Sequence, residues 1–468
     1  MAFIFSDSPS APRSMSDSQV EEELTNFQQH LTSSLSASPN DPVVLGTYAS
    51  FLTTVPSKFT TACTNYESCL KACIDPATKE VSEIYSTPFA TFSGMYASFL
   101  LGSASGSSTA IKEQADGLFS KALAVEPGNP LLFGDYATYL HRHKKDYAAA
   151  DAAYRKHLGD FPGHSSIWTK YGNFLKSVKR DVAGAENAYR TAVKRSPLNA
   201  DCLSSYAVFC HGTKGDHDAA ESLYERAYAA DPGHVNNLSN YGLFLSEIKC
   251  DFQRAEYMYQ TAMSVDPAHP NSMYNYAVLC DSGLGKQAEA EELYRQCLET
   301  SPNHAFALYN LAVLVEERRG HTETGRQEAD ELFKSAVTVS KNDAVTIADY
   351  GRFKLVCCKE IDQAEQLLKQ ARNIDPSCIV ACYNLGMLYY NCKDDKKTAE
   401  ECFRDAIKAD PDHGETWRYL GRIMADKGDA GNADKFYKKA LERAKDAEAA
   451  AQIRKEMEGA GKKRRGSK

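Results

Sequence analysis

The chain has 468 residues, 43% hydrophobic and 25% charged, which is the balance of a folded protein and not of a disordered or membrane-embedded one. Its net charge of −8 leaves no large basic field to hold a phosphate backbone, so we do not expect nucleic acid as a partner. Because a single hydrophobic core stops growing at about 250–300 residues, the chain forms either several domains or an elongated stack.

The first 38 residues fall into two parts. Residues 1–15 are rich in Ser and Pro and are expected to be disordered. Residues 16–38 are expected to form an N-terminal capping helix, because Ser18 and Glu21 make a capping box and Leu24, Phe27 and Leu31 follow at helical spacing.

Both ends of the chain bear on its location. Met1–Phe5 is too short an apolar run for a secretory signal, and the acidic cluster Glu21 to Glu23 is untypical of a mitochondrial leader. No apolar run approaches the roughly 18 residues of a membrane helix. We expect a cytoplasmic protein with reduced cysteines. A nuclear location is the alternative, through the basic run Lys462, Lys463, Arg464 and Arg465.

A fixed period dominates the middle of the chain. Marker prolines recur every 35 residues at Pro127, Pro162, Pro197, Pro232, Pro267 and Pro302. Tyrosines keep the same step at Tyr136, Tyr171, Tyr206, Tyr241 and Tyr276, and again at Tyr154, Tyr189, Tyr224, Tyr259 and Tyr294. A constant period of this length is typical of a solenoid, in which each repeat covers its neighbour.

The register extends in both directions, with interruptions. Pro39 opens the first repeat, and the second is displaced by an insertion at 74–88 and contains a Gly/Ser segment at 102–108. The repeat that begins at Pro302 is four residues longer than its neighbours, with the excess in 316–326. We expect eleven repeats over 39–445. Over 446–468 we expect a C-terminal cap extension, in which the last helix continues through Ala450, and then a basic tail.

Within a repeat the apolar pattern predicts two helices. Leu203, Tyr206, Ala207 and Cys210 lie on one helical face, and a second helix repeats that spacing from Ala220 onward. Gly212 and Gly215 break the chain between the two helices, and the Asp that precedes each of several marker prolines ends the second. The predicted fold is therefore all-α, a right-handed superhelical solenoid of antiparallel helix pairs.

The repeats resemble tetratricopeptide repeats. Trp168, Tyr171 and Gly172, followed by Ala185, Tyr189, Ala192 and Pro197, reproduce that family's order of residues, and Trp417, Leu420 and Gly421 begin the same order in the last repeat. The resemblance covers nearly the whole chain, with one extra residue per repeat placed between the helices. It implies a superhelix whose concave surface is lined by the first helix of each repeat.

Positions counted from the marker proline locate that surface. Core residues lie at positions 6, 9, 10 and 13, so positions 4, 8 and 11 project to the other side of the helix. The predicted partner-binding residues are the position-8 row Asp135, Lys170, Ser205, Asn240, Asn275, Asn310, Asp349 and Asn384, with the position-11 aliphatics Val208, Leu243, Val278 and Val313. The position-11 row also contains Thr138, Asn173 and Arg352.

The chemistry of these rows suits an extended peptide. Asn offers two donors and an acceptor, so a regular row of Asn side chains can bind the backbone amides of a peptide whatever the peptide's sequence. It resembles the asparagine ladder in the tetratricopeptide array of O-GlcNAc transferase. The other interpretation is that Asn is frequent at this position and the aliphatic side chains pack on the next repeat.

Catalytic and metal signatures are not evident. Gly283–Lys286 lacks the spacing of a Walker loop, and the helical pairs Cys69 with Cys73 and Cys378 with Cys382 are interpreted as small apolar core residues. We therefore expect no enzyme, no cofactor and no metal.

The predicted function is a non-catalytic scaffold or adaptor that binds an extended peptide or a protein partner on the concave face. The alternative is an RNA-binding protein of the pentatricopeptide class, which is also built from 35-residue helical hairpins. The Tyr-Gly and Asp-Pro pattern and the acidic balance fit that class poorly. A regulatory subunit of an enzyme complex would differ from the scaffold only in its partner.

Overall fold

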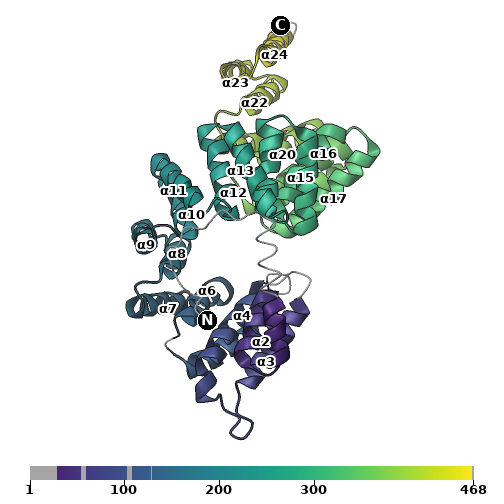
Figure 1. Cartoon of the computed structure of the whole chain (residues 1–468). Helices are drawn as coiled ribbons and strands as arrows, with labels where there is room; N and C mark the ends of the chain where they lie inside the picture. Colours follow the sequence, from purple (N-terminus) through teal and green to yellow (C-terminus); the bar gives the residue numbers. More distant parts are fainter. Residues whose placement is uncertain (1–28, 54–58, 103–107, 128, 466–468) are drawn as a thin grey trace. The chain divides into compact units, whose positions relative to one another are not determined.

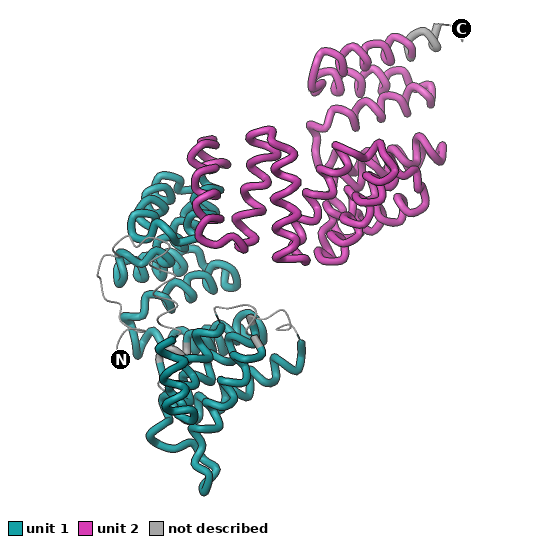
Figure 2. Tube along the Cα trace, turned by 45° about the vertical axis from the view of Figure 1, so that its right-hand side comes forward, with its two compact units in different colours: residues 1–244 teal, residues 245–468 magenta. Residues whose placement is uncertain are grey.

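The computed structural model describes residues 29–53, 59–102, 108–127 and 129–465. These residues form two compact units, 1–244 and 245–468 (Figure 2). The regular elements in the described ranges are helices, as Figure 1 shows, and the one isolated β-bridge there joins Ile74 to Val81. The expectation of an all-α chain of helix pairs is confirmed.

Unit 1 contains the following elements in chain order: α2 (Pro42–Leu52), α3 (Phe59–Ala72), η2 (Glu83–Tyr85), α4 (Ser86–Gly102), α5 (Thr109–Val125), α6 (Pro130–Tyr139), η3 (Leu140–Lys144), α7 (Tyr147–Asp160), α8 (Ser165–Phe174), η4 (Leu175–Lys179), α9 (Val182–Arg195), α10 (Ala200–Phe209), η5 (Cys210–Lys214), α11 (His217–Ala230) and α12 (Val235–Phe244).

Unit 2 contains the following elements: η6 (Leu245–Lys249), α13 (Phe252–Val265), α14 (Pro270–Val278), η7 (Leu279–Gly283), α15 (Gln287–Thr300), α16 (Ala305–Arg319), α17 (Glu323–Ser340), α18 (Ala344–Phe353), η8 (Lys354–Cys358), α19 (Ile361–Ile374), α20 (Ile379–Asn391), α21 (Lys396–Ala409), α22 (Gly414–Asp426), α23 (Ala430–Glu442) and α24 (Ala447–Arg465).

Helices pack first with the partner in their own repeat and then with the next repeat. In unit 1, α8 packs against α9, and α10 packs against both. The core between them is aromatic: Tyr189 and Phe209 are fully buried with ring centroids 5.0 Å apart. The second tyrosine series is buried throughout, as its strict period predicts. Gly172 explains why small residues follow the first series, since a Cβ there would lie 3.0 Å from the Tyr189 ring.

The extra residue of the 35-residue repeat lies in a π-helical turn. α8 does not stop at Phe174 but continues into η4, where the backbone N–H of Arg180 donates to the Leu175 carbonyl oxygen. Arg180 is left-handed, with φ of 56°, and Gly215 takes the same place after η5 with φ of 67°. The sequence prediction placed the break at both Gly212 and Gly215. Only Gly215 ends the first helix, because Gly212 lies inside the π turn η5.

An aspartate caps the next helix directly after η3, η4, η5 and η6. The Gly184 N–H donates to Asp181 Oδ1 at 2.8 Å, and Asp146, Asp216 and Asp251 cap α7, α11 and α13 in the same way. A side-chain acceptor here satisfies an amide that the first helical turn leaves unpaired. The turn and the cap together fix the hairpin of these four repeats.

Carboxylates on the second helix join successive repeats. Asp151 of α7 accepts from the Tyr171 hydroxyl of α8 at 2.9 Å and lies 3.6 Å from Lys179 Nζ. Glu256, Asp330 and Glu365 make the same two kinds of contact with the following tyrosine and lysine in unit 2. We call this arrangement the carboxylate clasp. It lies between neighbouring repeats, and the sequence analysis did not anticipate it.

The chain ends test the predicted boundaries only in part. Residues 1–15 and most of the predicted capping helix lie outside the described residues, but 29–37 are helical and Leu31 is buried. At the other end, the prediction of one helix through Ala450 is wrong. α23 stops at Glu442, and α24 starts anew and runs to Arg465, held to α22 by ion pairs from Arg418 and Arg422 to Glu456.

Candidate functional site

The position-8 residues of neighbouring repeats can lie side by side. In unit 1, Lys170 of α8 places its Nζ 3.0 Å from Asp135 Oδ1 of α6, at the same position one repeat earlier. Both side chains are partly exposed, as is Ser205 of α10. Asn240 of α12 is half-buried too. The row predicted for unit 1 is therefore a partly solvated strip, in which one anion and one cation neutralise each other.

Core tyrosines point their hydroxyls at these rows. In unit 1, the Tyr189 hydroxyl donates to Asn173 Oδ1 at 2.7 Å, and the Tyr154 hydroxyl lies 3.3 Å from Thr138 Oγ1. Both partners occupy position 11. Where position 11 is Val208, the hydroxyl of Tyr224 is buried and unpaired. The position-11 row is thus the outer edge of the aromatic core as well as part of the predicted surface.

In unit 2 the position-8 side chains are oriented by bonds within the protein. The Asn310 amide nitrogen lies 3.3 Å from the Tyr274 hydroxyl and 3.4 Å from that of Tyr294. Asp349 accepts from the Tyr309 hydroxyl at 2.7 Å. The bonds of Asn310 use its nitrogen and leave its carbonyl oxygen as an acceptor. Asn384 is only 5% exposed and donates to the Val380 carbonyl oxygen, so it is the least accessible of the predicted residues.

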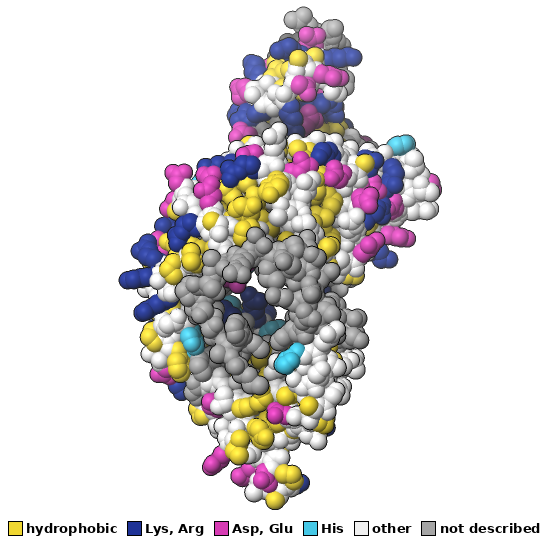
Figure 3. Space-filling model, viewed as in Figure 1, with side chains coloured by type: hydrophobic (Ala, Val, Ile, Leu, Met, Phe, Trp, Pro, Cys, Tyr) yellow, Lys and Arg dark blue, Asp and Glu magenta, His cyan; other side chains and the backbone are white. Residues whose placement is uncertain are grey.

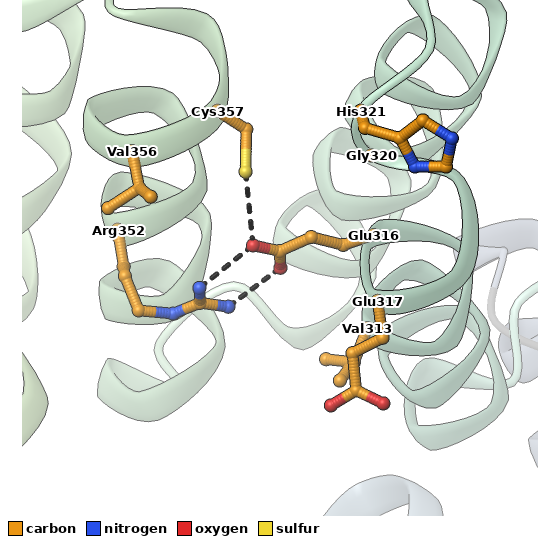
Figure 4. Close-up of a pocket in the computed structure, with 8 residues that line it drawn as sticks. All are labelled: Val313, Glu316, Glu317, Gly320, His321, Arg352, Val356 and Cys357. Atoms are coloured by element: carbon orange, nitrogen blue, oxygen red, sulfur yellow. Dashed lines mark hydrogen bonds and ion pairs between the residues drawn. The ribbon is translucent and has the colours of Figure 1, made fainter.

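Two successive members of the position-11 row in unit 2 line a cavity. Val313 of α16 and Arg352 of α18 border a space of about 530 Å³, together with Glu316, Glu317, Gly320, His321, Val356 and Cys357 (Figure 4). α16 forms one wall and stays α-helical to Arg319, whereas α8 and α10 pass into a π turn at the corresponding place. Gly320 and His321 of the lining lie in the connection between α16 and α17, within the segment 316–326 that contains the extra residues.

An ion pair lies across the cavity. Figure 4 shows the Arg352 guanidinium facing the Glu316 carboxylate, which it contacts with two nitrogens at 2.8 and 2.7 Å. Burial opposes the charge on Arg352, but the hydrogen bonds to Glu316 outweigh it and raise the Arg352 pKa. Burial and the same carboxylate raise the pKa of the Cys357 thiol to about 11, so it stays protonated and donates to Glu316 Oε1 at 3.3 Å. Arg352 and Glu316 neutralise each other, and Glu317 adds a carboxylate to the lining.

Position 4 of the same helices, which the sequence analysis placed on the same side as positions 8 and 11, is apolar and exposed. The Phe306 side chain on α16 is 67% exposed and Val345 on α18 is 47% exposed. In unit 1 position 4 carries exposed Ser166 and Asp201 instead. The period in the sequence identifies Phe306 and Val345 as position-4 residues. Whether such a side chain is exposed depends on what packs beside it.

A second cavity lies at the other interruption of the register. A space of about 770 Å³ in unit 1 is bordered by α3, the loop that includes the Ile74–Val81 bridge, and helices α4 and α5. Leu70, Val81, Phe89 and Leu118 supply its apolar wall. Both cavities thus occur where inserted residues disturb the repeat.

Metal and membrane features are not found in the described part of the chain. No three His, Cys, Asp or Glu side chains there are grouped closely enough to hold a metal ion. None of the helices in the same ranges has the length and apolar character to cross a bilayer. Cys69, Cys73, Cys378 and Cys382 are buried free thiols, as expected of core residues.

Comparison with known families agrees with the geometry. Models of the tetratricopeptide repeat match residues 178–235, 270–304 and 393–450. No curated protein matches the chain in sequence.

Solved structures share the fold. A monomeric variant of IFIT1 with m7Gppp-AAAA has a TM-score of 0.50 at 13% identity and covers 91% of this chain and 95% of its own. Human IFIT1 with PPP-AAAA gives 0.47 at 14% identity over 80% and 96%. YrrB, a protein with tetratricopeptide repeats and an unusual peptide-binding site, gives 0.34 at 20% identity over 41% and 95%.

The family matches agree with the helix pairs described above. The matched segments lie in both units, one in unit 1 and two in unit 2. The chain is a tetratricopeptide-repeat protein.

Proposed function

We propose that this protein is an interaction scaffold and that the position-8 and position-11 rows of unit 2 bind an extended peptide segment of a protein partner. The observation that carries the proposal is that Val313 and Arg352, consecutive members of one predicted row, border a cavity of about 530 Å³. A space of this size accepts a side chain or a short segment with little rearrangement.

The peptide would combine polar and apolar contacts. The carbonyl oxygen of Asn310 can accept from a peptide N–H, while Val313 and exposed Phe306 offer apolar area to its side chains. Internal bonds already hold Asn310 and Asp349 in place, so binding costs little side-chain entropy. A preorganised polar row beside an apolar strip is suited to an extended chain.

Affinity purification of the full chain, followed by direct binding of each recovered protein in calorimetry, tests the proposal. The variant Val313→Glu places a charge in the cavity and should weaken a genuine partner at least about tenfold. Val265→Glu is the matched control, because Val265 is 52% exposed and belongs to neither row. Melting curves establish that both variants fold. Equal binding by wild type and Val313→Glu, or the absence of any protein partner, would refute the proposal.

RNA binding is the competing class, because the monomeric IFIT1 structure contains m7Gppp-AAAA. Basic side chains on the rows of this chain are paired with acids: Lys170 with Asp135, Arg352 with Glu316 and Arg422 with Glu456. The face seen in Figure 3 likewise mixes Lys and Arg with Asp and Glu. Tight single-stranded RNA binding that weakens steeply with salt would favour that class over ours.

A further inference from the structure

The residue two places after a marker proline directly precedes the first helix of its repeat, and before α14 and α16 it is a histidine whose ring caps the helix. The Ser272 N–H donates to His269 Nδ1 at 3.2 Å, and the Ala307 N–H donates to His304 Nδ1 at 3.1 Å. Each imidazole accepts a hydrogen bond that the first helical turn cannot supply itself. It can do so only in the neutral form, with its proton on Nε2.

Protonation would reverse this contact. The imidazolium carries hydrogen on both nitrogens, so Nδ1–H would face a backbone N–H that can only donate. Its positive charge would also lie at the positive end of the helix dipole. The Ser272 hydroxyl, 2.7 Å from His269 Nδ1, can turn and accept, but the backbone amide cannot.

We propose that the histidine caps of His269 and His304 make the starts of α14 and α16 pH-sensitive, so that the first turn of each helix loosens when the imidazole takes up a proton. The inference does not depend on the proposed function, since it concerns only the helix starts. It gives unit 2 a means of responding to mild acid close to the proposed binding rows, because the His304 ring stacks 4.9 Å from the Tyr274 ring, and the hydroxyl of Tyr274 bonds Asn310.

The surroundings set the direction of the effect. Burial lowers the pKa of His269, and Asp266, the charged group that acts on it among the described residues, opposes this to a smaller extent. Burial also lowers the pKa of His304, whose ring neighbours Tyr274 and Phe306 are uncharged at neutral pH. Because both folded pKa values lie below the unfolded one, the caps are intact at neutral pH and are lost as the pH falls below about 6.5.

Neighbouring repeats provide internal references. α10 begins with Asn199, whose Oδ1 accepts from the Cys202 N–H at 2.9 Å, and an amide does not titrate. α12 begins with His234, but its Nε2 lies 2.9 Å from Asp201 Oδ1 and that hydrogen bond raises the His234 pKa. Protonation there gains an ion pair with Asp201, next to Asp231, as it loses the cap. The cleanest effect is therefore expected at α14 and α16.

Hydrogen exchange of the full chain at about pH 7.5 and about pH 5.5, read by mass spectrometry and corrected for intrinsic exchange, tests the inference. Protection of the first-turn amides of α14 and α16 should fall about tenfold at the lower pH, while that of α10 stays unchanged. The variant His269→Asn/His304→Asn should keep its protection at both pH values. The reverse variant Asn199→His should make the start of α10 pH-sensitive.

Three results would overturn the inference. One is unchanged protection of α14 and α16 in the wild type. Another is an equal loss in the double Asn variant, which would assign the effect to other groups. The third is a loss of protection spread evenly over α10, α14 and α16, which would indicate global acid unfolding instead of local loosening.

Discussion

α8 and α16 each begin directly after a histidine that follows a marker proline by two residues. His304 caps α16 with its ring nitrogen, whereas His164 makes no such bond to α8, and the two helices also end differently. α8 closes in the π turn η4, and Arg180 and Asp181 start the next helix at once. α16 continues as an α-helix to Arg319 before Thr322 caps α17. The regular repeat closes its hairpin with a π turn. The lengthened repeat keeps a 15-residue α-helix that borders the cavity with Arg352, and its extra length lies in α17, which has 18 residues where α9 has 14.

This comparison indicates where in such a solenoid a binding site can form. A regular repeat buries its own residues against the next and leaves a shallow surface. Cavities of about 770 and 530 Å³ adjoin the insertions at 74–88 and 316–326. The same physics that makes the repeats stack makes an interruption expose concave surface, because inserted residues have no counterpart in the adjacent repeat.

The largest expected effect comes from breaking the ion pair between Glu316 and Arg352. Glu316→Gln leaves the Arg352 guanidinium without its two-nitrogen contact, and Arg352→Met leaves the Glu316 carboxylate, 9% exposed, uncompensated. Each single variant should lose about 2 kcal/mol in urea unfolding, less than a fully buried pair because Arg352 is 30% exposed. The double variant should recover much of that loss. Additive losses would mean that the pair is not coupled.

Next in size is the close contact of helices within a repeat. In α20 a Cβ at Gly386 would lie 2.5 Å from the Phe403 ring, so Gly386→Ala should cost about 1–3 kcal/mol. Gly117→Ala in α5 is the control, because a Cβ there meets no atom within 4 Å, and it should stabilise by about 0.5–1 kcal/mol. Chemical denaturation of both variants measures the contrast. A neutral Gly386→Ala would show that α20 and α21 can separate freely.

A smaller effect should distinguish Tyr189 from Tyr224, two core tyrosines in different regular repeats of unit 1. Tyr189→Phe removes a hydroxyl bonded to Asn173 and should cost about 1 kcal/mol in urea unfolding. Tyr224→Phe removes a buried hydroxyl without a partner and should be neutral or slightly stabilising. Val208→Thr copies the pairing of Thr138 with Tyr154, so it should give Tyr224 a partner and stabilise the wild-type background. Equal losses in the two Phe variants would contradict this interpretation.

The smallest effect concerns the carboxylate clasp at Glu365. Hydrogen bonds from Lys369, Lys393 and Tyr389 lower its pKa to about 2. Because the folded pKa is depressed, the stabilisation is complete above about pH 4.5 and is lost as the pH falls toward 2. The difference in urea midpoint between wild type and Glu365→Gln should shrink over that window, by under about 1 kcal/mol, since the partners are solvent-screened. A difference that is constant with pH would refute the assignment.

The period in the sequence was sufficient for the helix pairs, the buried second tyrosine series and the small residues beside it. These follow from local patterns that repeat, so that one repeat predicts all of them. The π turns were not predicted, because an i to i+5 turn has no residue signature apart from the left-handed position, which Gly215 marks and Arg180 does not. The predicted contact rows could be placed on a helix face, but their accessibility could not.

Sequence by itself determined that this is a stack of tetratricopeptide-like hairpins, and it singled out the positions that face away from the core. Tertiary structure decided which of those positions can meet a partner. Asn384 is buried whereas Phe306 is exposed, and Val313 borders a cavity whose other side is formed by Arg352, Val356 and Cys357 of the next repeat. The physical reason is that periodicity fixes direction around a helix axis, while exposure and concavity depend on what the neighbouring helix places opposite.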